Sequence, residues 1–163
     1  MVALGSKGTA VVTTPSDTQI LITREFAAPR HAVFRVLTEP ELIKRWWSGG
    51  FGEVVLAEVD LRVGGRWRYV MVSDGNEIGF HGEYREVVPG ERIVCTEIYE
   101  GVPGGSDPAL CTYELTEEGG RTTLSLLTEM ASKEDRDALL ASGMEAGVQA
   151  GYDLLEKIAI SLR

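Results

Sequence analysis

The chain has 163 residues, 44% of them hydrophobic and 25% charged, which is the composition of one globular domain. Its 25 acidic residues outnumber the 16 lysines and arginines, so the formal net charge is -9. Such a chain, without a basic block, repels the phosphates of nucleic acids and of anionic membranes, so neither is expected as a partner. No apolar run approaches the roughly 18 residues of a membrane span, so no membrane insertion is expected.

Residues 1–17 contain several Gly, Ser and Thr and are expected to form a flexible lead-in to a single domain at residues 18–163. The lead-in lacks the charged start and the continuous apolar core of a secretory signal. We therefore predict a cytoplasmic protein in which both cysteines stay reduced.

The domain is predicted to begin with a strand and a helix. Apolar residues alternate over 20–26, as in a strand. Pro29 then stands where the first turn of a helix tolerates proline, and the apolar residues after it predict a helix that ends near Leu37.

A second short helix is predicted next, because Thr38 and Glu41 have the spacing of a capping box. It carries Trp46 and Trp47 and ends at residues 48–50. Adjacent residues of a helix point about 100° apart, so at most one tryptophan is expected to enter the interior fully. We expect one to plug the end of the sheet and the other to lie at the rim or entrance.

Residues 51–130 change to strand spacing, with glycine-rich turns between the segments. Short links require antiparallel neighbours, so a meander is expected. The six strands are predicted at residues 53–62, 66–73, 77–88, 91–100, 109–117 and 121–130.

The C-terminal part returns to helical spacing. Ser132 with Asp135, and Ser142 with Glu145, are two cap-like pairs. A final helix of some twenty residues has one apolar stripe, formed by Met144, Val148, Gly151, Tyr152, Leu155, Ile158, Ala159 and Leu162. Its exposed positions are expected to be Glu145, Gln149, Asp153, Glu156 and Lys157.

This order of elements describes the helix-grip fold of the START and Bet v 1-like (SRPBCC) superfamily. Within it, residues 18–162 resemble the activator of Hsp90 ATPase homologue 1-like family. The residues that carry the resemblance are Arg24-Glu25-Phe26-Ala27-Ala28-Pro29, Val33-Phe34, Leu37-Thr38, Pro40-Glu41, Trp46-Trp47, Arg62-Val63-Gly64-Gly65, Trp67 with Tyr69 and Met71, Gly82-Glu83-Tyr84, Val88-Pro89-Gly90-Glu91-Arg92, and Gly143-Met144 with Gly147.

The resemblance implies an α+β fold in which an antiparallel sheet of six to seven strands wraps around the long C-terminal helix. It also implies a cavity between sheet and helix for a small hydrophobic, aromatic or lipid-like ligand, with no cofactor. In one departure, many members of the family have a tryptophan where this chain has Val148. A smaller residue there either enlarges the cavity or is compensated by its neighbours.

Aromatic residues are the main candidates for the cavity lining. Trp67, Tyr69 and Met71 alternate onto one face of their strand, where they either form a wall for an apolar ligand or simply fill the core. The full set of lining candidates is Trp47, Trp67, Tyr69, Met71, Tyr84, Tyr99, Tyr113, Met144, Val148 and Tyr152.

His81 and Glu97 are the candidate polar residues of the cavity. His81 has the opposite strand parity to Tyr84, so a surface or hydrogen-bonded histidine is expected. Glu97 shares a face with Cys95 and Tyr99, but an inward carboxylate is costly unless it is paired.

An outward Glu97 is therefore expected. If it does point inward, the candidate partners are Arg66, Arg68 and His81.

The two cysteines are predicted to face each other. If the loop at 101–107 folds symmetrically about Pro103, residues whose numbers sum to 206 are opposite, which pairs Cys95 with Cys111. In a reducing cytoplasm we expect two small apolar side chains in contact, although the thiols are close enough to bridge.

A ligand-binding function is the leading hypothesis. The chain has no G-x-S-x-G, H-E-x-x-H or G-x-x-x-x-G-K-[ST] motif, and its two isolated histidines do not make a metal site. One alternative is a cyclase- or aromatase-like enzyme, which needs His81, Glu83 or Glu97 inside the cavity. Another is an Hsp90-related co-chaperone of the stress response, which predicts a large exposed apolar patch.

Hsp90 contact is not expected to follow from the family name. The eukaryotic co-chaperone has an additional N-terminal domain that makes most of that contact, and this chain is too short to hold it. A homodimer is compatible with the sequence.

Overall fold

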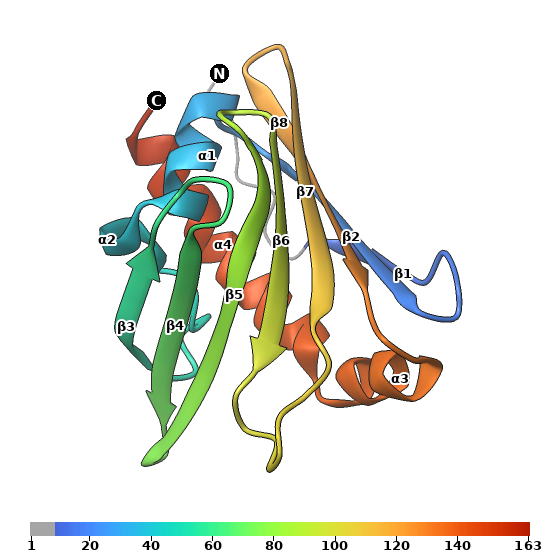
Figure 1. The fold of residues 1–163 in the computed structure, drawn as a ribbon. Coiled ribbons are helices and arrows are strands. Elements are labelled where there is room, and N and C mark those ends of the chain that lie inside the picture. Colours follow the sequence, from blue (N-terminus) through green and yellow to red (C-terminus); the bar gives the residue numbers. More distant parts are fainter. Residues whose placement is uncertain (1–8) are drawn as a thin grey trace.

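The computed structural model describes residues 9–163 and confirms the α+β helix-grip architecture. Strand β2 (Gln19–Phe26) leads into helices α1 (Arg30–Thr38) and α2 (Pro40–Ile43), and the chain ends with α3 (Lys133–Ala141) and α4 (Met144–Ser161) (Figure 1). Between them lies the meander, formed by β3 (Glu53–Val59), β4 (Arg66–Ser73), β5 (Asn76–Val88), β6 (Arg92–Tyr99), β7 (Ala109–Glu118) and β8 (Arg121–Glu129).

The strands form one antiparallel sheet in the order β1-β2-β8-β7-β6-β5-β4-β3. The eighth strand is β1 (Val11–Thr13), which lies in the segment that was expected to be flexible and pairs with β2. That part of the prediction is wrong because β-branched residues favour a strand and the free edge of β2 offers hydrogen bonds. The rest of the predicted lead-in, residues 1–8, lies outside the described residues.

The segment before β1 is also tied to the last helix. Ala10 is buried, and the side-chain amide of Gln149 bonds to both its N–H (3.0 Å) and its carbonyl (2.7 Å). Gln149 was expected to be solvated, but it is partly buried because it satisfies these two backbone groups.

Two of the three predicted helix caps are wrong. The Thr38 hydroxyl donates to the Phe34 carbonyl (2.8 Å), so Thr38 ends α1 and α2 starts without a side-chain cap. The Ser142 hydroxyl likewise donates to the Leu139 carbonyl (2.6 Å). A hydroxyl after a helical turn can bond back to a carbonyl three or four residues earlier, and here that competing bond wins.

The cap at Ser132 is confirmed. Its hydroxyl accepts from the Asp135 N–H at 3.1 Å and satisfies one of the free N–H groups at the start of α3. Helix α4 begins instead after Gly143, whose φ of 82° lies in the left-handed region that glycine adopts without strain.

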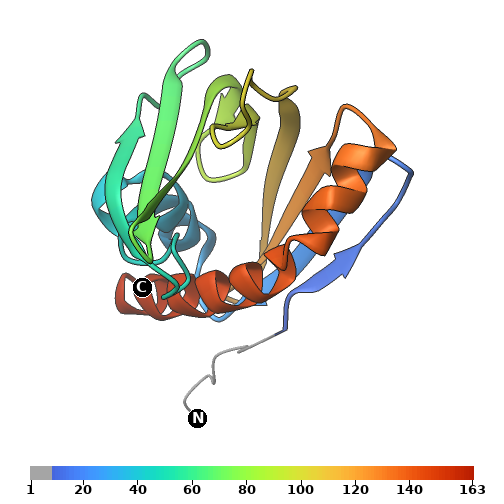
Figure 2. The same cartoon turned by 90° about the horizontal axis from the view of Figure 1, so that it is seen from below.

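Helix α4 crosses the concave side of the curved sheet (Figure 2). Its C-terminal half belongs to a tightly packed core with α1, β2 and β8, in which Phe26, Val33, Leu124 and Leu155 are at most 1% exposed. This end of the molecule is filled by side chains, so space for a ligand would have to lie nearer the N-terminal half of α4.

A buried ion cluster fixes α4 to β2. Arg24 is 1% exposed, and its guanidinium lies 2.9 Å from Asp153 and 3.0 Å from Glu156 on α4. The second carboxyl oxygen of Glu156 accepts the Ala27 N–H at 2.9 Å. Glu156 was expected to be exposed but is 3% exposed, because the buried arginine requires a carboxylate beside it.

Replacing Arg24 by methionine leaves two carboxylates without their cation, so the free energy of unfolding should fall by about 3–5 kcal/mol. Urea denaturation followed by circular dichroism measures the change. Arg35→Met is the control, because the Arg35–Glu39 pair is exposed and its loss should hardly move the midpoint. Equal effects of the two substitutions would show that the buried cluster does not hold α4.

Candidate functional site

An unbroken row of aromatic rings lies on the inner face of β4, β5 and β6. Ring centroids are 5.1 Å apart for Tyr99 and Phe80, 5.6 Å for Phe80 and Trp47, 5.5 Å for Trp47 and Tyr69, and 4.8 Å for Tyr69 and Trp67. Trp47 joins the row from the turn that follows α2. These rings make one side of the region between sheet and helix predominantly aromatic.

The two adjacent tryptophans point to different places, as their spacing predicted. Trp47 contacts the row, whereas Trp46 packs against Tyr152 of α4 with ring centroids 6.2 Å apart. The Trp46 indole N–H donates to the Val36 carbonyl at 2.9 Å. Trp46 therefore fills the junction of the helices.

Trp67 is held in place by the backbone of β6. It is 6% exposed, and its indole N–H donates to the Thr96 carbonyl at 3.1 Å. The indole lies over Gly82 of β5, where a Cβ atom would be 2.6 Å from Trp67 Nε1 and 1.8 Å from the Thr96 oxygen. Only glycine leaves room for this arrangement.

Several inward side chains keep partial exposure although protein surrounds their polar atoms. Burial raises the pKa of the Tyr69 and Tyr113 hydroxyls well above the usual range, yet neither side chain is fully buried. The hydroxyl groups of these two tyrosines are thus shielded from bulk water, although part of each side chain stays accessible. The inward residues of intermediate exposure are Trp47, Tyr69, Met71, Phe80, Glu97, Tyr113, Leu126, Met144 and Val148.

The remaining lining candidates divide into two groups. Trp67, Tyr84 and Tyr152 are at most 6% exposed and lie within packed clusters, so they belong to the core. Tyr99 is 41% exposed, at the outer end of the aromatic row.

Three residues of this region were not among the sequence candidates. Phe34 of α1 and Leu126 of β8 contact both of the larger core clusters, and Phe80 lies in the aromatic row. For Phe80 a signal existed, because it has the same strand parity as Tyr84. For Phe34 and Leu126 the sequence offers no sign that they lie where two clusters meet.

Glu97 points inward, contrary to the expectation. Its carboxyl lies beside Cys111, whose thiol donates to Oε2 at 3.6 Å. Burial raises the pKa of this carboxyl. Strand alternation fixes its side, because its neighbours Cys95 and Tyr99 also face inward, and this constraint outweighs the cost of desolvating a carboxyl group.

The three partners considered for Glu97 do not lie near it. Arg68 and His81 are on the outer face, where both bind Glu100 at 2.8 Å and 2.7 Å. These two contacts, with the arginine contributing most, lower the pKa of Glu100 to about 2. Glu83 is paired in register with Arg66 and also belongs to this face.

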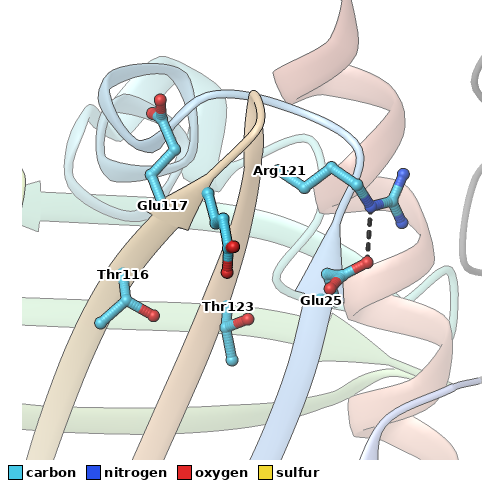
Figure 3. A pocket seen from close by; sticks show the side chains of 6 residues that line it. Glu25, Thr116, Glu117, Arg121 and Thr123 are labelled. Carbon is cyan, nitrogen blue, oxygen red and sulfur yellow. Dashed lines mark hydrogen bonds and ion pairs between the residues drawn. The ribbon is translucent and has the colours of Figure 1, made fainter.

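Two surface hollows have charged residues in their lining. The one beside His81 is lined on the outer face by Arg62, Arg66, Arg68 and Glu100 among others. The second lies at the ends of β2, β7 and β8, where Arg121 pairs with Glu25 beside Thr116, Glu117 and Thr123 (Figure 3). It contains none of the predicted site residues.

The cysteine pairing is confirmed. Cys95 and Cys111 are opposite in the β6–β7 register, and both are free and buried. The neighbouring Cys95 thiol, together with burial, raises the pKa of the Cys111 thiol well above its usual value. Within residues 9–163, no group of three or more His, Cys, Asp or Glu side chains is placed to hold a metal ion.

The curved antiparallel sheet around a long C-terminal helix defines a helix-grip protein of the SRPBCC class. The family model described as activator of Hsp90 ATPase homolog 1-like protein matches residues 27–159, so the chain belongs to this family. None of the curated proteins matches the chain. Within residues 9–163, no helix has both the length and the apolar character needed to span a bilayer.

Solved structures of bacterial proteins share the fold over nearly the whole chain. A Rhodobacter sphaeroides protein is 25% identical with a TM-score of 0.85, covering 93% of this chain and 99% of that one. A Nitrosomonas europaea protein is 25% identical with a TM-score of 0.80, covering 90% and 97%. A Mycobacterium smegmatis protein, 23% identical with a TM-score of 0.81 and covering 94% and 99%, shows the fold alone.

Alanine at Gly82 should displace the Trp67 indole and separate β5 from β6, which lowers the free energy of unfolding by about 1–3 kcal/mol. Tryptophan emission should shift to longer wavelength as the indole gains contact with water. The control is Gly147→Ala on α4, where a Cβ would meet no atom within 4 Å and alanine favours the helix. Unchanged emission in Gly82→Ala would contradict this account of the Trp67 position.

Neither thiol should react with Ellman's reagent in the native protein, because Cys95 is 4% exposed and Cys111 is 2% exposed. In denaturant both should react. Fewer than two reactive thiols in the denatured protein would reveal a disulfide and argue against a cytoplasmic location.

Proposed function

We propose that this protein binds a small apolar ligand, aromatic or lipid-like, between the inner face of β4–β7 and the N-terminal half of α4. The observation that carries the proposal is the row of five aromatic rings whose middle members remain partly exposed on the concave side. The Phe26 ring, at the other end of the molecule, is by contrast buried completely.

The two ends of α4 support this location. The C-terminal half is fixed by Arg24 and packs against fully buried residues. The N-terminal half presents Met144 and Val148, which are only partly buried and pack against the same core cluster. A thioether and a short aliphatic side chain leave an adaptable surface, which suits an apolar ligand.

The uncharged fluorescent probe N-phenyl-1-naphthylamine should bind, with a rise in its emission and quenching of tryptophan fluorescence. Val148→Trp should fill the space opposite the rings and weaken binding about tenfold or more without lowering the melting temperature. Ala146→Trp is the matched control, because Ala146 is exposed on the same helix and a new ring there should not reach the site. Absence of probe binding, or equal affinities of the two variants, would argue against the proposal.

A cyclase- or aromatase-like reaction is the second candidate function, and the inward Glu97 is the observation that favours it. An inward carboxyl group with a raised pKa has the properties of a general acid or base. An enzyme would return a bound compound in altered form and a binding protein would return it unchanged. Mass spectrometry of compounds recovered from the protein distinguishes the two.

No surface observation favours a chaperone-partner role. The large exposed apolar residues among those described are spread over separate elements, with Phe51 before β3, Val63 before β4 and Leu110 on β7. Single exposed apolar residues of this kind are normal on protein surfaces.

A further inference from the structure

Glu97 is an inward carboxyl group that has no cationic partner among residues 9–163. It lies on the inner face of β6, and no Lys, Arg or His of residues 9–163 comes within ion-pair distance of it. Within the described residues, its one hydrogen-bonding neighbour is the Cys111 thiol at 3.6 Å.

The titratable groups around Glu97 come from every element that packs there, and none carries a positive charge. Tyr69 of β4, Cys111 and Tyr113 of β7 and Tyr152 of α4 all interact with it electrostatically. Burial raises the pKa of each of the three tyrosines, and contact with Cys95 raises that of Cys111, so all four are neutral near pH 7. Glu97 alone can supply charge in this region.

Arg24, the other inward charged residue of the sheet, has the ion-pair partners that Glu97 lacks among residues 9–163. The chain gives that other inward charge two carboxylates and thereby offsets its desolvation. Glu97 receives no such partner, although removing it by a change to Gln or Met would be the simpler way to avoid an unpaired carboxyl. A buried acid in this position is best satisfied by a cation that arrives with the ligand.

We propose that the ligand of this site carries a protonated amine that pairs with Glu97, while its apolar body lies against the aromatic row. This inference rests on the proposed function and specifies the class of ligand. The aromatic rings are consistent with it, because the faces of Trp, Tyr and Phe attract an organic cation within about 6 Å. Carboxylic acids would be repelled by an ionised Glu97, and alcohols would gain a hydrogen bond without the charge.

The affinity for amines should depend on pH in a defined direction. In the empty protein burial favours the protonated carboxyl, which cannot pair with an ammonium ion. Amine affinity should therefore increase as the pH rises through the pKa of Glu97, and should decrease only when the amine itself deprotonates, near about pH 10. A neutral alcohol should show no such increase.

The test measures displacement of N-phenyl-1-naphthylamine by three compounds with one skeleton: 4-phenylbutylamine, 4-phenylbutanol and 4-phenylbutyrate. In the unmodified protein near neutral pH, the amine should bind about tenfold more tightly than the alcohol, and the acid most weakly. Glu97→Gln should abolish the preference for the amine. Glu83→Gln is the matched control, because Glu83 lies on the outer face in the same part of the sheet and should keep it.

The outcomes separate the two proposals. If the probe binds but the amine has no advantage, or keeps its advantage in Glu97→Gln, the amine inference is wrong and the apolar site stands. If the probe does not bind, the proposed function fails and the inference fails with it. If Glu97→Gln does not fold, the pH profile of the unmodified protein decides, because an amine affinity that never rises with pH relative to that of the alcohol overturns the inference.

Discussion

The ion cluster at Arg24 is the constraint on which the rest of the structure depends. A guanidinium that is 1% exposed can exist there only because Asp153 and Glu156 face it from α4. The cluster therefore determines which residues of the last helix meet β2, and the apolar core around α1 closes over that end. In the other half of α4, Met144 and Val148 are only partly buried and pack against the edge of the same core.

The two inward charges of the sheet have opposite consequences for function. Arg24 is satisfied within the chain and contributes to stability. Among residues 9–163, Glu97 is left with a weak thiol donor, and the proposed recognition of an amine rests on this difference. Functional groups are commonly found where a local rule of stability is broken, and the unpaired carboxyl is the clearest such break in residues 9–163.

Much of the fold could be predicted from the sequence, because glycine-rich turns mark the strand ends and short links impose the meander. Even the Cys95–Cys111 register followed from the symmetry of one loop. The errors arose where two local rules compete. A hydroxyl such as that of Thr38 can bond forward or backward along the chain. The desolvation rule placed Glu97 outside, whereas strand alternation, which is geometrically stricter, placed it inside.

The bond between Gln149 and Ala10 has a mechanical consequence. One side-chain amide occupies both hydrogen-bonding groups of the residue that precedes β1, and β1 in turn is paired with β2. The N-terminal half of α4 is thus held at the β1 edge of the sheet by these two hydrogen bonds. Nearer its C-terminus, the helix is held by the ion pairs of Arg24. Any movement of this part of α4 away from the β1 edge of the sheet must first release two hydrogen bonds.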